Sequence, residues 1–195
     1  MCIRDRYNLS RNNGIKWTED LIIYYWDKIY WNALSSNSGL ECSNEFLEKH
    51  ANMFEWGNDG LSRVSSINWT EDFIEKHKEN LGWGRYGISW NIGLLWTMEL
   101  INRYEDKWDW DGLSLNKGLC WSIELIEKYK DKWDWGTRWR SYGLSNNRAL
   151  PWSIELIETY KDKLTDSWSS NPSVWEKVIY PPLNFDLVKK ILKMK

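Results

Sequence analysis

A unit of about 25 residues recurs six times along the chain, starting at Leu9, Leu34, Leu61, Ile88, Leu113 and Leu144. Its clearest copy runs from Leu113 to Trp135 and reads Leu-Ser-x-Asn-x-x-Leu-x-Trp-Ser-x-Glu-Leu-Ile-x-x-Tyr-x-Asp-Lys-Trp-Asp-Trp. A fixed period in the range of roughly 20–50 residues is typical of proteins that stack one small structural unit on copies of itself. The repeat therefore predicts a stacked array rather than a fold built around one central core.

Each copy carries the signals of one short capped helix. A threonine or serine follows the aligned tryptophan or cysteine in all six copies: Thr18, Ser43, Thr70, Thr97, Ser122 and Ser153. A hydroxyl at this point accepts a hydrogen bond from an otherwise unpaired N–H of the first helical turn, so we interpret it as the N-cap. Apolar residues then follow at helical spacing, as in Leu125, Ile126, Tyr129 and Trp133. Such a helix spans only about three turns and needs neighbouring copies to be stable.

A second tryptophan, such as Trp110, follows each of the first five helices, and the next Leu-Ser-x-Asn begins after a variable gap. We interpret this part as a second short helix or a single turn. The predicted fold is an all-α, short-repeat α-solenoid of about six helix-turn-helix units plus a C-terminal cap. Residues 9–167 hold the six tandem repeats, and residues 168–195 hold a degenerate seventh repeat and a cap helix.

One alternative architecture contains strands. Leu144–Pro151 reads Leu-Ser-x-Asn-x-x-Leu-Pro and partly resembles the conserved segment of leucine-rich repeats, in which a short strand precedes an asparagine ladder. The full leucine spacing is absent, and no copy has a long alternating run. An α/β solenoid of this kind is therefore the alternative to the all-α fold.

The N-terminus lies outside the repeat. Met1–Arg6 resembles the in-frame translation of a sequencing adapter. We therefore expect residues 1–8 to be an artefact or a disordered lead.

The unit Trp-Ser-x-Glu-Leu-Ile-x-Lys-Tyr-x-Asp-Lys-Trp at Trp121–Trp133 resembles that of uncharacterised, tryptophan-rich bacterial tandem-repeat proteins. The resemblance covers nearly the whole chain from Leu9 onward. It implies a repeat fold and no defined biochemistry.

The charges are balanced, with 26 Lys and Arg against 28 Asp and Glu, which gives no basic surface for nucleic acid. The longest apolar and aromatic run, Leu21–Trp26, is far shorter than a membrane span. We therefore expect neither nucleic acid nor a membrane as a partner.

No residue pattern indicates an enzyme, a cofactor or a metal site. The two histidines, His50 and His77, align with a tyrosine column of the repeat, which predicts packing rather than catalysis or metal binding. The repeated serines and asparagines, as in Ser114 and Asn116, have two interpretations. Buried side chains would bond the backbone between copies, whereas exposed ones would line a polar groove.

Departures from the repeat are the positions where a specific function is expected. The longest insertion follows Trp135, and a shorter one follows Trp83. They supply the predicted partner-binding residues Arg138, Trp139, Arg140, Tyr142, Arg85 and Tyr86. Arg, Trp and Tyr are the residue types enriched at interface hot spots.

The leading functional hypothesis is a non-enzymatic repeat scaffold that binds another protein. The alternative is a glycan-binding module that stacks sugars on exposed tryptophans. A third hypothesis, single-stranded RNA with one base stacked per repeat, is disfavoured by the balanced charge.

Overall fold

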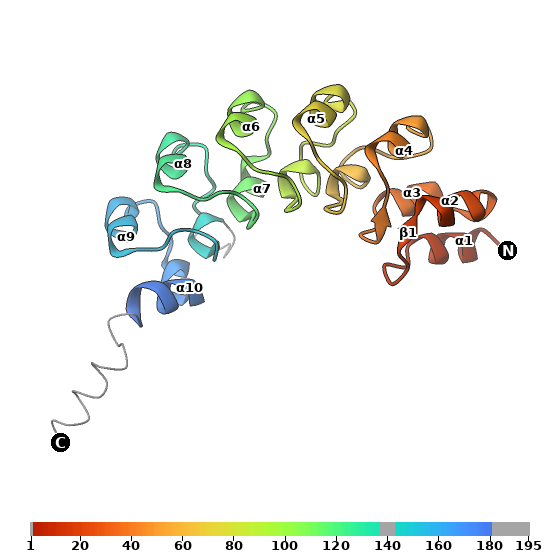
Figure 1. Cartoon of the computed structure of the whole chain (residues 1–195). Helices are drawn as coiled ribbons and strands as arrows, with labels where there is room; N and C mark the ends of the chain where they lie inside the picture. Colours follow the sequence, from red (N-terminus) through yellow and green to blue (C-terminus); the bar gives the residue numbers. More distant parts are fainter. Residues whose placement is uncertain (1, 137–142, 181–195) are drawn as a thin grey trace, which may run out of the picture. The chain divides into compact units, whose positions relative to one another are not determined.

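The computed structural model describes residues 2–136 and 143–180 (Figure 1). The protein forms two compact units, residues 1–112 and 113–195. The described residues contain ten α-helices and two strands of two residues each, so the predicted mostly helical class is confirmed.

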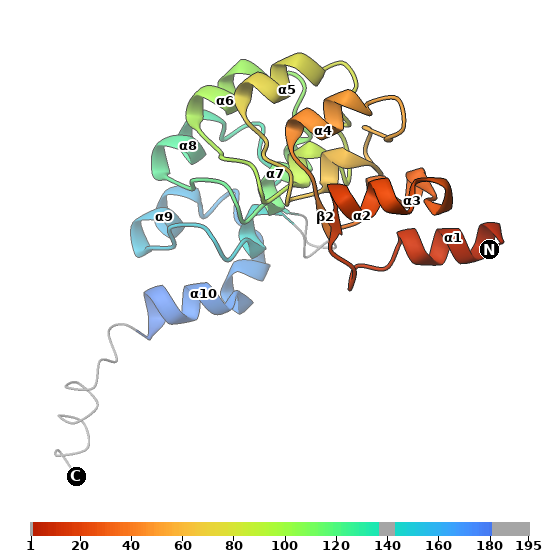
Figure 2. The same ribbon diagram turned by 45° about the vertical axis from the view of Figure 1, so that its right-hand side comes forward.

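The first unit alternates capped helices with shorter second elements. Its α-helices are α1 (Ile3–Ser10), α2 (Glu19–Tyr24), α3 (Trp31–Ser35), α4 (Asn44–Lys49), α5 (Glu71–His77) and α6 (Met98–Arg103). Its single turns of 3-10 helix are η1 (Trp26–Lys28), η2 (Leu61–Arg63) and η3 (Ile88–Trp90). Helices α4, α5 and α6 follow one another side by side in this unit, as Figures 1 and 2 both show.

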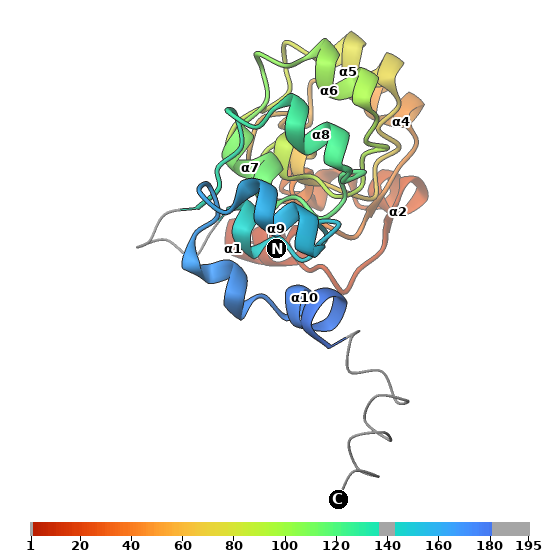
Figure 3. The ribbon, with the colours of Figure 1, turned by 90° about the vertical axis from the view of Figure 1, so that its left-hand side faces the viewer.

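The second unit continues the same alternation. Helix α7 (Trp110–Leu115) begins in the first unit and ends in the second. The remaining elements are α8 (Ile123–Lys128), η4 (Leu144–Asn146), α9 (Ile154–Tyr160), η5 (Asp166–Ser170), α10 (Pro172–Val174) and a π-helical turn, η6 (Trp175–Ile179). Figure 3 views this unit with α9 in front of α8.

The predicted N-cap is confirmed in all six copies. Each cap hydroxyl accepts a hydrogen bond from the backbone N–H three residues later, at 3.1 to 3.4 Å. The predicted apolar stripe is also confirmed, because Leu125, Ile126, Tyr129 and Trp133 are all buried. The local pattern therefore determines where each long helix begins and which side it buries.

The second element of each copy is a short helix or a single turn, as predicted. It is α-helical in α3 and α7 and a 3-10 turn in η2, η3, η4 and η5. Only these short elements vary in type, whereas the capped element is an α-helix in every copy.

The structure corrects the all-α prediction at one place. Strand β1 (Trp17–Thr18) pairs in parallel with β2 (Leu40–Glu41), with Trp17 opposite Leu40. The Trp17 backbone N–H donates to the Gly39 carbonyl at 2.8 Å. Both strands follow the asparagine of their copy, whereas the leucine-rich alternative places its strand before that residue.

Helix α1 begins inside residues 1–8, the segment that the repeat leaves out. The ring of Tyr7, on α1, lies edge-on to that of Tyr30, with 5.6 Å between centroids. The Ser10 hydroxyl, at the end of α1, accepts a bond of 2.8 Å from the Tyr30 N–H. These contacts attach α1 to the residues just before α3.

At the other end, Asn171 has the contacts expected of a seventh copy. Its amide donates to the carbonyls of Ser145 and Asn147, at 3.3 and 3.4 Å. The predicted cap helix over Phe185–Leu192 lies outside the described residues. None of the helices in the described ranges has the length and apolar character needed to cross a membrane.

Candidate functional site

The repeated serines are internal structural groups. Ser10, Ser35, Ser62, Ser89, Ser114 and Ser145 are completely buried. Each hydroxyl accepts a hydrogen bond of 2.8 to 3.1 Å from the backbone N–H twenty residues later. Ser35, Ser62, Ser89 and Ser145 also donate to a backbone carbonyl. The acceptor is the second tryptophan of the preceding copy, which is Trp31, Trp56, Trp83 or Trp135. Of the two interpretations, the structure therefore supports the bonding of buried backbone.

The repeated asparagines form a similar ladder. Asn37, Asn91, Asn147 and Asn171 are at most 2% exposed. Each amide nitrogen donates to two backbone carbonyls of the preceding copy, at 2.7 to 3.4 Å. Each side-chain oxygen accepts from the N–H two residues later, at 2.8 to 3.0 Å. These asparagines have no exposed polar edge with which to line a groove.

Most tryptophans are also used internally. Of the sixteen described, eight are buried and only Trp175 is classed as exposed. In eight of them the indole N–H donates to the backbone carbonyl five residues earlier, at 2.8 to 3.2 Å. A sugar-stacking surface needs at least two accessible indole faces, and the described tryptophans supply little exposed indole.

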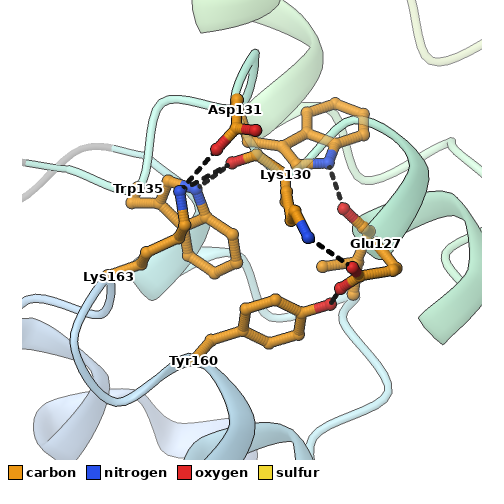
Figure 4. Close-up of polar contacts among 8 residues, drawn as sticks. Glu127, Lys130, Asp131, Trp135, Tyr160 and Lys163 are labelled. Carbon is orange, nitrogen blue, oxygen red and sulfur yellow. Dashed lines mark hydrogen bonds and ion pairs between the residues drawn. The ribbon is translucent and has the colours of Figure 1, made fainter.

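In the second unit, charged and phenolic groups connect the copy that contains α8 to the copy that contains α9 (Figure 4). The Tyr160 hydroxyl donates to the Glu127 carboxylate at 2.6 Å, and Lys130 pairs with the same carboxylate at 2.6 Å. Lys163 pairs with Asp131 at 2.8 Å. Burial, followed by the bond to Glu127, raises the pKa of Tyr160 to about 12.

The first unit repeats this arrangement between α5 and α6. The Tyr104 hydroxyl bonds to Glu75, and Lys107 pairs with Glu79 at 3.1 Å. These four residues, with Lys78 and Arg103, line a hollow of about 550 Å³. Its charges are already paired, since Lys78 pairs with Glu75, Lys107 with Glu79 and Arg103 with Glu71 outside the hollow, so this hollow has a structural role.

A larger groove, of about 690 Å³, lies among the short elements and turns of the first unit. We call this surface the edge groove, and its lining residues are Tyr7, Arg11, Tyr30, Asn32, Ala33, Ser36, Glu55, Gly57, Asp59, Gly60 and Arg63. Arg11, Ser36 and Arg63 occupy the variable position of Leu-Ser-x-Asn in three successive copies. The variable position of Leu-Ser-x-Asn therefore faces this groove in these three copies.

The edge groove differs from the hollow between α5 and α6 in its unpaired charges. Within the described part of the chain, the side chains of Arg63, Glu55 and Asp59 make no hydrogen bond or ion pair. Arg11 donates to the Tyr7 hydroxyl at 2.7 Å and keeps its other guanidinium donors free. The groove thus offers guanidinium, carboxylate and phenol groups to a ligand.

Two of the predicted partner-binding residues lie next to this groove. Arg85 and Tyr86 are exposed, and the Arg85 guanidinium lies 4.9 Å from the centre of the Tyr86 ring. Tyr86 lies 5.7 Å from Trp90, whose indole N–H donates to the Asp109 carboxylate at 2.8 Å. Trp90 is the variable residue of its Leu-Ser-x-Asn segment, as Arg63 is of the preceding one.

Close packing of two turns joins this cluster to the edge groove. A Cβ added to Gly82 would lie 2.2 Å from the Asn58 nitrogen, and one added to Gly87 would lie 2.6 Å from the Asn58 side-chain oxygen. Asn58 lies between Gly57 and Asp59, which line the groove. The turn that carries Arg85 and Tyr86 therefore packs against the turn that lines the groove.

Tyr86 has a backbone conformation that is unusual for its residue type. Its φ of 64° makes it the only described non-glycine residue with a positive φ. The left-handed region disfavours a side chain, and such residues cluster at binding sites.

The other predicted residues, Arg138, Trp139, Arg140 and Tyr142, lie outside the described residues. Sequence reasoning missed Arg11, Arg63 and Trp90. They belong to a variable column inside an otherwise regular motif, and that variability was the available signal.

The histidines pack as predicted from their column. His77 stacks on Trp56, with 4.3 Å between ring centres, and His50 lies 4.6 Å from Phe46. Among the described residues, no group of three His, Cys, Asp or Glu side chains could hold a metal ion. No family model, curated protein or solved structure matches this chain.

Proposed function

We propose that the protein is a non-enzymatic scaffold that binds another protein through the edge groove and the neighbouring turn that carries Arg85 and Tyr86. In this proposal the six helix-turn-helix copies form an α-solenoid. The contact surface is the edge groove together with Arg85, Tyr86 and Trp90.

The main support is the contrast between used and unused polar groups. The serine, asparagine and indole groups of the repeat bond to backbone inside the array. On the edge, Arg63, Glu55 and Asp59 have no partner among the described residues. Unpaired groups of both charge signs suit a polar protein segment better than a purely anionic ligand.

The composition of the edge supports the same conclusion. Arg11, Arg63, Arg85, Tyr86 and Trp90 belong to the residue types that contribute most energy at protein interfaces. The insertion residues Arg138, Trp139, Arg140 and Tyr142, at the end of the fifth copy, are a second proposed contact of the same residue types, and they lie outside the described residues.

The proposal can be tested by selecting binders from a library of displayed peptides on the immobilised full chain. Peptides that bind the wild type should lose at least about tenfold in affinity for an Arg63→Ala, Tyr86→Ala double variant. A second variant, Trp139→Ala with Arg140→Ala, tests the insertion. Lys117→Ala is the matched control, because Lys117 is exposed and lies in the second unit.

Far-UV circular dichroism should be unchanged in all variants, which separates lost binding from lost folding. If no peptide binds above background, or if every selected peptide binds both edge variants as tightly as the wild type, the proposal is wrong.

The second candidate function is glycan binding. Its specific support is the presence of Tyr7 and Tyr30 beside Asn32 and Asp59 in the edge groove, since aromatic faces and polar groups together suit sugars. Titration with a panel of glycans, followed by tyrosine and tryptophan fluorescence, distinguishes the two functions. Saturable spectral changes that are lost in Tyr30→Ala would favour the glycan.

A further inference from the structure

A polar contact is repeated between the capped helices of successive copies. In the second unit, Tyr160 and Lys163 of one copy donate to Glu127 and Asp131 of the copy before it, at 2.6 and 2.8 Å. In these copies the donors stand seven and ten residues after the N-cap, and the acceptors stand five and nine residues after it.

The first unit has the same pair of contacts. Tyr104 and Lys107 donate to Glu75 and Glu79 of the preceding copy. The positions relative to the N-cap are identical to those in the second unit. In both pairs, the later copy supplies the donors on its backward side and the earlier copy supplies the acceptors on its forward side.

In the first copy the backward donors have no partner. Tyr25 and Lys28 occupy the donor positions, seven and ten residues after Thr18. Tyr25 is 39% exposed, whereas the equivalent tyrosines Tyr104 and Tyr160 are 5% and 4% exposed. No acceptor among the described residues bonds to the Tyr25 hydroxyl or the Lys28 amine.

The core positions of the first copy are also incompletely covered. Leu9, Ile15 and Leu21 are half-buried. The residues aligned with Leu9 and Ile15 in the next five copies are all 5% exposed or less: Leu34, Leu61, Ile88, Leu113, Leu144, Leu40, Ile67, Leu94, Leu119 and Leu150. The amide nitrogen of Asn12, unlike that of Asn37, has no acceptor in the described structure.

One position on the α2 surface is aromatic where the next four copies carry Lys or Arg. Tyr24 is 78% exposed and packs edge-on against Tyr25, at 4.8 Å. Its counterparts Lys76 and Arg103 pair with carboxylates of the preceding copy. An exposed aromatic pair of this kind suits burial against a further helix.

The complementary acceptors are found on α9. Glu158 and Asp162 stand five and nine residues after Ser153, at the positions of Glu127 and Asp131. Both are exposed, and neither has a hydrogen bond or an ion pair within the described ranges.

We propose that the chain associates head to tail with a second copy of itself, with the α2 surface of one copy against the α9 surface of another. Tyr25 and Lys28 of one molecule then bond to Glu158 and Asp162 of the next. Because the two surfaces differ, the contact is heterologous, so a molecule bound through one surface still offers its other surface to a further molecule.

Sedimentation velocity and light scattering on the full chain test this at low and at physiological salt. The average mass should rise with concentration past that of a dimer. Lys28→Glu and Asp162→Lys should each weaken association at least about tenfold, because like charges then meet. The double variant Lys28→Glu, Asp162→Lys restores the opposite charges and should restore association.

Lys117→Glu is the control, since it makes the same charge change away from both surfaces. Arg63→Ala with Tyr86→Ala should leave association unchanged, which separates this contact from the proposed partner-binding edge. A monomer at every concentration would overturn the proposal. So would a closed dimer, or association that Lys28→Glu and Asp162→Lys leave unaffected.

Discussion

The hydroxyl of Tyr160, on α9, donates a 2.6 Å hydrogen bond to the carboxylate of Glu127, on α8. Tyr104 and Glu75 make the same contact between α6 and α5. A bond from a neutral phenol to a carboxylate exists only while the phenol holds its proton, so these contacts make stability depend on pH.

Burial, followed by the bond to a glutamate, raises the pKa of both Tyr104 and Tyr160 to about 12 from an ordinary value of 10.0. A raised pKa means that the folded state holds the proton more tightly than the unfolded state. This contribution to stability is complete below about pH 10 and is lost as the pH rises toward 12. In urea unfolding from pH 8 to 12, the free energy of unfolding of the wild type should fall toward that of the double variant Tyr104→Phe, Tyr160→Phe. A constant difference across that range would contradict the assignment.

Ser89→Ala should destabilise the first unit by about 1–3 kcal/mol, because it leaves buried backbone groups unpaired. The hydroxyl accepts from the Asp109 N–H at 3.0 Å and donates to the Trp83 carbonyl at 2.6 Å. Chemical denaturation measures the change. Ser65→Ala is the matched control, since Ser65 is exposed and its removal should cost less than about 0.5 kcal/mol. Equal effects of the two variants would show that the serine ladder contributes nothing specific.

Thr70→Ala should cost about 1 kcal/mol through loss of the N-cap of α5. The Thr70 hydroxyl accepts the Phe73 N–H at 3.2 Å. Thr70→Ser keeps that acceptor and should stay within a few tenths of a kcal/mol of the wild type. Thermal unfolding of the three proteins, followed by circular dichroism at about 222 nm, ranks their stabilities. A serine variant as unstable as the alanine variant would argue against capping.

Tyr86→Gly should leave the protein as stable as the wild type or stabilise it by up to about 1 kcal/mol, because glycine adopts a positive φ without steric cost. Tyr86→Val places a β-branched residue at φ 64° and should destabilise by about 1–2 kcal/mol. Denaturation curves check both changes. In the peptide-binding assay both variants should bind weakly, since both lack the phenol. A glycine variant that is less stable than the valine variant would show that Tyr86 is not strained.

Some features could be predicted from the sequence because they depend on neighbouring residues. The six caps, the apolar stripe at Leu125 and Tyr129, and the short second elements are all set within about a dozen positions. The histidine column was likewise predictable, because His77 stands where Tyr104 stands in the next copy.

Other features could not be predicted because they join residues one copy or more apart. The sequence left two roles open for Ser89 and Asn91, and only their burial and bonding distinguished them. The short pairing of β1 with β2 was missed, since two-residue strands leave no alternating pattern.

By itself, the sequence determined the period, the start of each capped helix and the side that each helix buries, because capping and amphipathic spacing act over a few residues. The tertiary structure alone decided which repeated polar groups are bonded inside each unit and which remain unbonded on its surface. Arg63 and Lys107 look alike as charges in the chain, yet Lys107 has a carboxylate partner 28 residues away and Arg63 has none among the described residues. That distinction depends on which copies lie side by side, and proximity in space is what fixes the energy of a charge.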